Sequence, residues 1–369
     1  LRFAIASCQH FEQGWFEAYR HILDDAPDLM VFLGDYIYES SWGDDLVRRH
    51  AGGECYELAD YRVRHAQYKT DPDLQRAHAA MPWLLTWDDH EVDNDPAGDI
   101  SEHLDPRFRL RRAAAYQAYW EHMPLPRAMA PRPDGSMPIH TTVDWGTLAR
   151  VHVLDDRQYR TPQACPQPNR HSSRYLADCG ELRDPQQTLL GRAQEDWLAA
   201  RFGDSSARWN LIGQQTLVAP MDEQPGKDRG VWTDGWDGYP LARERLLGDL
   251  KSTRLRNPVI AGGDLHCAVV ANVPSDPEDF DSAPVASEFV ATSISADAWP
   301  QSHYDELRPD NPHISHLRSD QRGYTLFDFD RERLSATLQV VKDVRVREAE
   351  FAVQAKFVVE NGNPGPQRV

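Results

Sequence analysis

Short apolar runs that end in polar residues recur along this chain. Four of them, at 2–8, 28–35, 84–90 and 258–264, run into Ser-Cys, Gly-Asp, Asp-Asp-His and Gly-Gly-Asp. Apolar runs of this length, bounded by glycine and polar residues, are typical of buried strands. Further strands are predicted at 148–155, 209–213, 285–292, 323–330 and 334–341.

Helical patterns separate these strands. We expect helices at 14–25, 57–80, 105–122, 189–202 and 239–251. Strands that alternate with helices predict an α/β fold, and the consecutive late strands predict a mixed or antiparallel part. Residues from about 359 are rich in Gly and Pro, so we expect a mobile tail there.

The polar ends of the four strands are candidates for one site. In open α/β sheets, ligands bind beyond the carboxyl ends of the strands. Residues 86–95 crowd carboxylates and amides around one imidazole. Such crowding costs free energy unless a cation lies among the charges. A solvated acidic turn is the alternative, but four polar ends at one edge of the sheet favour a metal site.

The individual side chains suit this interpretation to different degrees. Asp35 could bridge two cations or cap a helix. Tyr38 could offer a phenolate to a strongly Lewis-acidic ion, or simply pack. Cys8 could ligate as a thiolate or be an inert buried thiol. Asp264 and His266 lie two residues apart, so they face one way if that segment is extended.

Arg157 follows another predicted strand. Its guanidinium could hold a phosphate in a bidentate manner. A salt bridge to Asp155 or to another acid is the alternative. Trp42, Trp232 and Trp236 could line a pocket, although such residues more often pack in the core or on the surface.

Composition narrows the function. The 369 residues carry a net charge of -18, which argues against a nucleic-acid backbone or an anionic membrane as the main partner. No apolar run is long enough to span a membrane. Among five cysteines, Cys165 and Cys179 could form a disulfide in an oxidising compartment or remain free.

Several motifs taken together resemble the PhoD family of alkaline phosphatases. They are Ser7-Cys8-Gln9, the Gly-Asp-Tyr-Ile-Tyr-Glu of 34–39, the Trp-Asp-Asp-His-Glu-Val-Asp-Asn of 87–94, the Asp-Asp-Arg-Gln-Tyr-Arg of 155–160, and Gly263-Asp264-Leu265-His266. The resemblance implies a metallophosphatase-type β-sandwich, with two mixed β-sheets flanked by α-helices. Residues 1–358 would form this domain and residues 359–369 a flexible tail.

The resemblance also implies a metal content and ligands. Fe3+ would be held by Cys8, Asp35 and Tyr38, completed by Asp264 or His266. Ca2+ would lie beside it, bound by Asp89, Asn94 and the other member of the Asp264/His266 pair. A site for Zn2+ or Mn2+ is the alternative. His90 is expected beside the leaving group, and Arg157 is expected to clamp the phosphate.

The implied activity is hydrolysis of small phosphate esters by direct attack of a metal-bound oxo or hydroxide, releasing inorganic phosphate. A phosphodiesterase or phospholipase D-type hydrolase on the same site is the alternative. A calcium-stabilised binding module without turnover is a third possibility. Nucleic acid would enter only as a possible substrate, and no stable membrane insertion is expected. Family members usually carry an N-terminal β-sandwich domain and a twin-arginine export signal, so we expect a secreted or periplasmic protein.

Overall fold

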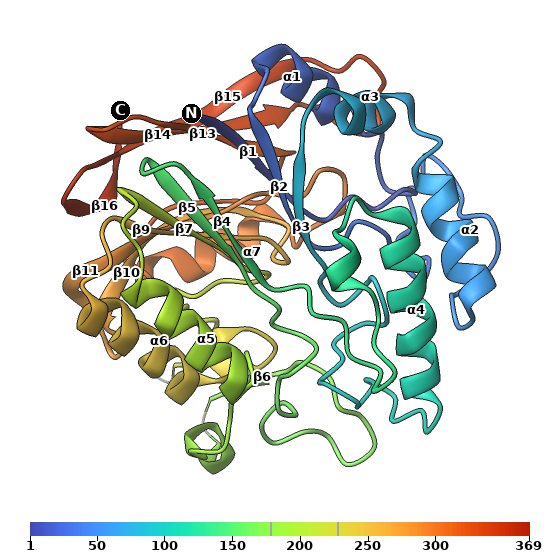
Figure 1. The fold of residues 1–369 in the computed structure, drawn as a ribbon, viewed down its shortest axis with the longest axis horizontal. Coiled ribbons are helices and arrows are strands. Elements are labelled where there is room, and N and C mark those ends of the chain that lie inside the picture. Colours follow the sequence, from blue (N-terminus) through green and yellow to red (C-terminus); the bar gives the residue numbers. More distant parts are fainter. Residues whose placement is uncertain (178, 227–228) are drawn as a thin grey trace.

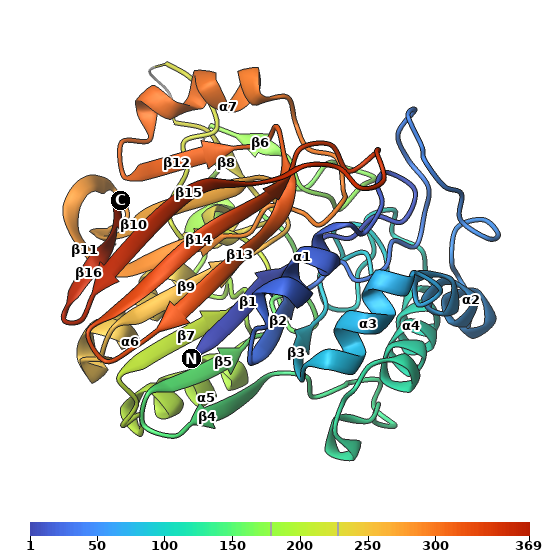
Figure 2. The same ribbon diagram turned by 90° about the horizontal axis from the view of Figure 1, so that it is seen from above.

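Two seven-stranded β-sheets pack face to face in the computed structural model, which describes residues 1–177, 179–226 and 229–369 (Figures 1 and 2). The first sheet has the order β16-β15-β14-β13-β1-β2-β3. Its strands are β1 (Arg2–Ala6), β2 (Leu29–Leu33), β3 (Trp83–Thr86), β13 (Arg322–Phe329), β14 (Arg333–Val341), β15 (Phe351–Glu360) and β16 (Asn363–Arg368).

The second sheet has the order β12-β10-β11-β9-β7-β5-β4. Its strands are β4 (Thr141–Trp145), β5 (Ala149–Val153), β7 (Trp209–Gly213), β9 (Pro258–Gly262), β10 (Ala268–Asp276), β11 (Asp279–Val290) and β12 (Ile314–Arg318). Both sheets combine parallel and antiparallel pairs, because β1-β2-β3 and β5-β7-β9-β11 are parallel series with antiparallel neighbours. A two-stranded ladder joins β6 (Tyr175–Leu176) to β8 (Val231–Trp232). The predicted α/β sandwich of two mixed sheets is confirmed.

Helices cover the outer face of the second sheet and the part of the first sheet around β1, β2 and β3 (Figure 2). The first sheet carries α1 (Ala18–Asp25), α2 (Leu58–Tyr68), α3 (Pro72–Ala80) and α4 (Phe108–His122), and the second carries α5 (Arg192–Gly203), α6 (Pro240–Thr253) and α7 (Gln301–Leu307). Short 3-10 helices lie at Arg127–Met129, Gly180–Arg183, Trp236–Gly238 and Arg308–Asp310.

The helix predicted over 57–80 is two helices. The Asp71 side chain accepts hydrogen bonds from the backbone N–H groups of Asp73 and Leu74, and Pro72 occupies the first helical position. An N-cap followed by proline begins a new helix and prevents the previous one from continuing.

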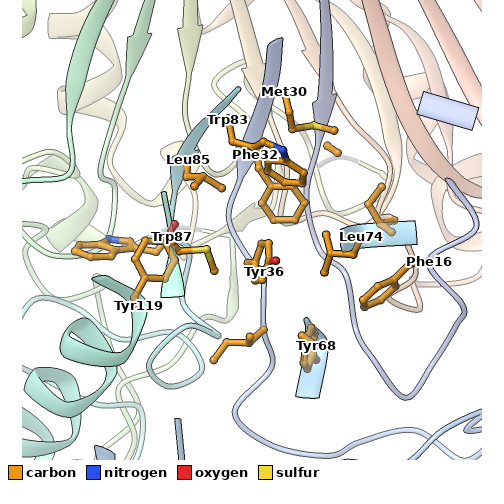
Figure 3. Packing of buried hydrophobic residues seen from close by; sticks show 14 of the residues in the cluster. Phe16, Met30, Phe32, Tyr36, Tyr68, Leu74, Trp83, Leu85, Trp87 and Tyr119 are labelled. Atoms are coloured by element: carbon orange, nitrogen blue, oxygen red, sulfur yellow. The ribbon is translucent and has the colours of Figure 1, made fainter. Parts of the chain in front are cut away.

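Burial on both faces explains why the central strands read as continuous apolar runs. In β2, Met30 and Phe32 face the helices, whereas Leu29, Val31 and Leu33 face the second sheet. Figure 3 shows the helix-side cluster, in which aromatic side chains of the strands interlock with those of the helices and loops.

The predicted mobile tail is wrong. Residues 363–368 form β16, which pairs with β15 at the edge of the first sheet. The turn between them is Asn361-Gly362, where Gly362 has a φ of +82°. An Asn-Gly pair supplies the positive φ that a tight hairpin requires, and prolines are tolerated in an edge strand. The Asn-Gly turn was therefore visible in the sequence, but the prediction of a mobile tail relied only on the high content of Gly and Pro.

Candidate metal centre

The predicted site residues gather at one rim of the sandwich, beyond the carboxyl ends of parallel strands. Cys8 follows β1, Asp35 follows β2, and Asp89 follows β3, all in the first sheet. Asp264 and His266 follow β9, which belongs to the second sheet. The expectation of a single sheet edge therefore needs correction, because the rim is shared by two sheets whose strand ends meet.

The backbone turns sharply at these positions. Cys8, Asp35, Asp264 and His266 have φ values of +58°, +55°, +61° and +55°. The left-handed region costs about 1–2 kcal/mol for a residue with a Cβ. Four such residues around one rim indicate that the fold tolerates local strain in order to direct these side chains inward.

Gly34 makes the turn after β2 possible. Its φ is +101°, and a Cβ placed there would lie 2.4 Å from the Cβ of Asp88. Because no larger residue fits, the chain after β2 passes directly against the chain after β3. This close approach places Asp35 next to the acidic stretch.

Three sets of potential metal ligands form one continuous cluster. They are Cys8-Asp35-His266, Asp35-Asp89-His90 and Asp88-Asp89-Asp264, and within each set the ligand atoms lie within 4.8 Å of one another. Asp35 and Asp89 each belong to two sets, so either carboxylate could bridge neighbouring ions. The structure thus brings the predicted ligand residues together, and the number and kind of ions remain a prediction.

The carboxylates retain unused oxygens. Within the described ranges, Asp35 Oδ1, Asp88 Oδ2 and Asp89 Oδ1 are buried and accept no hydrogen bond. Burial, followed by the neighbouring charge of Asp89, raises the pKa of Asp35 well above its ordinary value. Orphaned buried carboxylate oxygens are expensive unless a cation satisfies them. The residues present therefore fit a metal group.

The side chains of Tyr38 and His266 lie next to the carboxylate of Asp35. The Tyr38 hydroxyl is 2.9 Å from Asp35 Oδ2 and 3.0 Å from His266 Nε2. The carbonyl oxygen of Asp297 lies 2.5 Å from His266 Nδ1 and fixes the ring orientation. Burial lowers the pKa of His266 to about 3, so its Nε2 carries a lone pair available to a metal.

His90 packs against Tyr38, with the two ring centroids 4.3 Å apart, and belongs to the same ligand cluster as Asp35. Its Nδ1 is 2.7 Å from Glu39 Oε2, and its Nε2 is 4.0 Å from Asp89 Oδ2. Burial opposes the charged imidazolium, but Asp89 and Glu39 outweigh it and raise the pKa of His90 well above its ordinary value. Sequence reasoning assigned no role to Glu39, although it ends the same Gly-Asp-Tyr-Ile-Tyr-Glu motif.

Arg157 is enclosed by carboxylates. Its guanidinium pairs with Asp88 and with Asp234, the latter at 2.5 Å, and lies 3.3 Å from Asp264. Asp155 contacts only its backbone N–H, at 3.1 Å. Arg157 therefore forms ion pairs with acids other than Asp155, which was the alternative expected from the sequence. Its role as a phosphate clamp remains a prediction. Sequence reasoning missed Asp234, which no motif marked.

Asn94 and Glu91 complete the acidic loop in different ways. Asn94 lines the same cavity as Asp89, and its amide donates to Glu102 at 3.2 Å, so its ligand role remains a prediction. The carboxylate of Glu91 accepts backbone N–H groups from Asp35, Tyr36 and Asp88. Glu91 thus ties the turn after β2 to the turn after β3.

A cavity of about 590 Å³ opens above this cluster. Asp35, Asp89, His90, Asp264 and His266 lie in its wall. The tryptophans suggested from sequence also line it, namely Trp42, Trp232 and Trp236. Within the part of the chain that the structure describes, no helix is long and apolar enough to cross a membrane.

A two-sheet sandwich with a thiol, a phenol, imidazoles and carboxylates at one rim defines a metallophosphatase-type architecture. The family model of PhoD-like phosphatases matches residues 3–338. Alkaline phosphatase D of Bacillus subtilis is 40% identical over 382 residues, which include all of this chain and 64% of that protein. A solved structure of PhoD superimposes with a TM-score of 0.93 at 39% identity and covers all of this chain and 71% of its own.

The chain therefore belongs to the PhoD-like phosphatase family. It spans a little under two thirds of the length of its curated relative. The resemblance stated from motifs is confirmed.

Proposed function

We propose that this protein hydrolyses phosphate esters and releases inorganic phosphate, as an alkaline phosphatase. The observation that carries the proposal is the continuous ligand cluster around Asp35, with buried carboxylate oxygens left unsatisfied, at the floor of a cavity. A site that served only to stabilise a loop with calcium would not need the thiol of Cys8 or the phenol of Tyr38. Family membership and the name of the Bacillus relative support the same activity.

We further propose Fe3+ and Ca2+ as the metals. Cys8, Tyr38, Asp35 and His266 would hold Fe3+, because thiolate and phenolate donors suit a strongly Lewis-acidic ion. The oxygen-only set of Asp88, Asp89 and Asp264 suits Ca2+, with Asn94 as a further predicted ligand. Bound metals would supply Lewis acidity and lower the pKa of a water molecule.

The chain's own residues supply positioning and a proton. Glu39 holds His90 Nδ1, so the ring presents its Nε2 to the cavity beside Asp35 and Asp89. A protonated His90 can give its proton to the departing alkoxide, which makes a poor leaving group acceptable. Asp297 keeps the His266 ring in one orientation, and Glu91 keeps the two turns in register.

Metal removal and the substitution Asp35→Asn test this proposal together. Elemental analysis of the purified protein should find iron and calcium, and zinc or manganese would revise the metals but not the reaction. EDTA treatment and Asp35→Asn should each abolish hydrolysis of p-nitrophenyl phosphate, because Asp35 belongs to two ligand sets. If Tyr38 binds Fe3+ as a phenolate, the protein should have a visible charge-transfer band, and Tyr38→Phe should bleach or shift that band. Full activity in a verified metal-free sample would contradict the mechanism.

The size of the cavity favours a phosphodiester as a second substrate class. A volume of about 590 Å³ is within the range of sites for drug-sized ligands and leaves room on the alcohol side. Comparing p-nitrophenyl phosphate with bis(p-nitrophenyl) phosphate and with phosphatidylcholine would separate monoesterase, diesterase and phospholipase D-type activity.

We also propose that the protein functions outside the cytoplasm. The structure forms a disulfide between Cys165 and Cys179, and disulfides persist mainly in oxidising compartments. Fractionation of the producing cells, followed by thiol labelling of each fraction, would test this location.

A further inference from the structure

The cavity has a second half, beyond the metal cluster, whose chemistry differs from that of the floor. Its walls are formed mainly by aromatic and apolar side chains, together with the carboxyl groups of Glu223 and Asp237. The aromatic and apolar residues are Tyr175, Leu217, Met221, Trp232, Trp299, His303 and Tyr304. Within the described ranges, no lysine or arginine side chain lines the cavity. The described residues of this half therefore offer no permanently cationic side chain to an anion.

Glu223 is the carboxyl group of this half that pairs with no lysine or arginine among the described residues. Its side chain is 11% exposed, and its ion-pair contact within the described residues is His303 Nε2 at 4.0 Å. Burial, then the charges of Asp237 and Asp222, raise the pKa of Glu223 to about 8, so the side chain is ionised at alkaline pH, and a bound cation would favour its charged form at lower pH as well. By contrast, Asp237 is paired with Arg243 at 2.5 Å.

Aromatic rings line the same part of the cavity as Glu223. Tyr175 and Trp232 have ring centroids 4.6 Å apart, and His303 lies 5.7 Å from Trp299 and 5.1 Å from Tyr304. Trp299 is 61% exposed and Tyr175 is 44% exposed, so part of each ring is accessible to a ligand in the cavity. Aromatic faces around a carboxylate form the environment that binds ammonium and quaternary ammonium groups.

We propose that this half of the cavity binds the cationic alcohol part of the substrate, an amino alcohol or its quaternary ammonium analogue, while the phosphate lies over the metal cluster. The proposal rests on the phosphatase activity proposed above and names its substrate class. Hydrolysis breaks the bond between phosphorus and the ester oxygen. The oxygen of water joins phosphorus, a proton reaches the leaving oxygen, and the products are inorganic phosphate and the free amino alcohol.

Kinetics with a charged ester and its uncharged isostere test the proposal. Phosphocholine and 3,3-dimethylbutyl phosphate have the same shape, but only the first carries a positive charge. The wild-type enzyme should show a kcat/KM for phosphocholine about tenfold higher or more. Glu223→Gln should remove most of that preference and leave 3,3-dimethylbutyl phosphate and p-nitrophenyl phosphate nearly unchanged.

Glu306→Gln is the matched control. Glu306 is an exposed carboxylate on α7, the helix that also carries His303 and Tyr304, and it does not line the cavity. The substitution Glu306→Gln removes the same kind of side-chain charge as Glu223→Gln, from the same part of the molecule. Equal kcat/KM for the two esters in the wild type, or an equal loss of preference in both variants, would overturn the proposal.

A binding measurement separates this proposal from the activity on which it rests. Choline titrated against the native protein should quench tryptophan fluorescence, because Trp232 and Trp299 line the same wall. Glu223→Gln should weaken the apparent affinity several-fold, and 3,3-dimethylbutanol should bind more weakly than choline. Choline binding without hydrolysis of any ester would reject the phosphatase activity, whereas hydrolysis of p-nitrophenyl phosphate without choline binding would reject the cationic subsite alone.

Discussion

At the scale of single residues, the site depends on partners that hold the reactive groups in place. His90 faces the cavity, but the Glu39 carboxylate, 2.7 Å from its Nδ1, sets both the ring orientation and the charge. Burial raises the pKa of Glu39, but the charge and hydrogen bond of His90, together with the charge of Arg111, outweigh burial and lower the pKa, so Glu39 and His90 form a buried ion pair. A proton donor in this arrangement is already positioned before a substrate arrives.

Glu39→Gln should therefore impair the departure of poor leaving groups. We expect kcat for an alkyl phosphate to fall roughly tenfold or more, since partners that orient a functional histidine typically contribute that much. Hydrolysis of p-nitrophenyl phosphate should change less, because nitrophenolate departs without a proton. Glu244→Gln, an exposed carboxylate on α6, is the control. An equal loss on both esters would mean that Glu39 supports the fold and not the proton transfer.

At the scale of elements, ion pairs fix helices against one another on the outer face of the second sheet. Arg245 on α6 donates two hydrogen bonds of 2.8 Å to the Glu195 carboxylate on α5. Burial opposes the charged carboxylate, but the bonds from Arg245 and Thr188 outweigh it and lower the pKa of Glu195. A depressed carboxylate pKa means that the folded state favours the ionised form, so the pair stabilises the protein above the ordinary Glu pKa of about 4.3.

Glu195→Gln should lower the free energy of unfolding by about 1–2 kcal/mol at pH 7. The difference between wild type and variant should shrink as the pH falls below about 4.3 and through the lower pKa of folded Glu195, because both states then bind a proton. Urea titrations at pH 7, 4.5 and 3 would measure it. Asp196→Asn, an exposed carboxylate on the same helix, should show no comparable trend. A difference that stayed constant with pH would assign the effect to packing.

The elements also show what the sequence could and could not reveal. The apolar runs of the parallel strands and the polar residues after them were readable, because burial on both faces leaves a continuous hydrophobic pattern. The strands β10 and β12 were not predicted, and β15 was missed as well. Edge and antiparallel strands alternate weakly, and their partners lie far away in the chain. Likewise, Asp234 joins Arg157 and Arg160 from a distant loop, a contact that only the tertiary fold creates.

At the scale of the whole molecule, the last strand ties the two sheets together. β16 pairs with β15 of the first sheet and also lies against β10 and β11 of the second (Figure 2). The backbone N–H of Gly365 donates to Ser287 Oγ at 2.9 Å, across the boundary between the sheets. Its φ is +117°, and a Cβ there would lie 2.9 Å from Asn272 Oδ1. Only glycine allows the strand to approach so closely.

Removal of residues 361–369 should therefore reduce stability without altering catalysis. We expect the free energy of unfolding to fall by roughly 2–4 kcal/mol, because the β15 edge and part of the intersheet contact become exposed to water. Since no residue of β16 lines the cavity, kcat and KM for p-nitrophenyl phosphate at 25 °C should stay within about twofold of the wild type. Urea unfolding and steady-state kinetics on the same preparation would measure both. If the truncated protein lost activity while its free energy of unfolding stayed unchanged, β16 would instead influence the position of the metal-ligand residues, and that influence would have to pass through the two sheets.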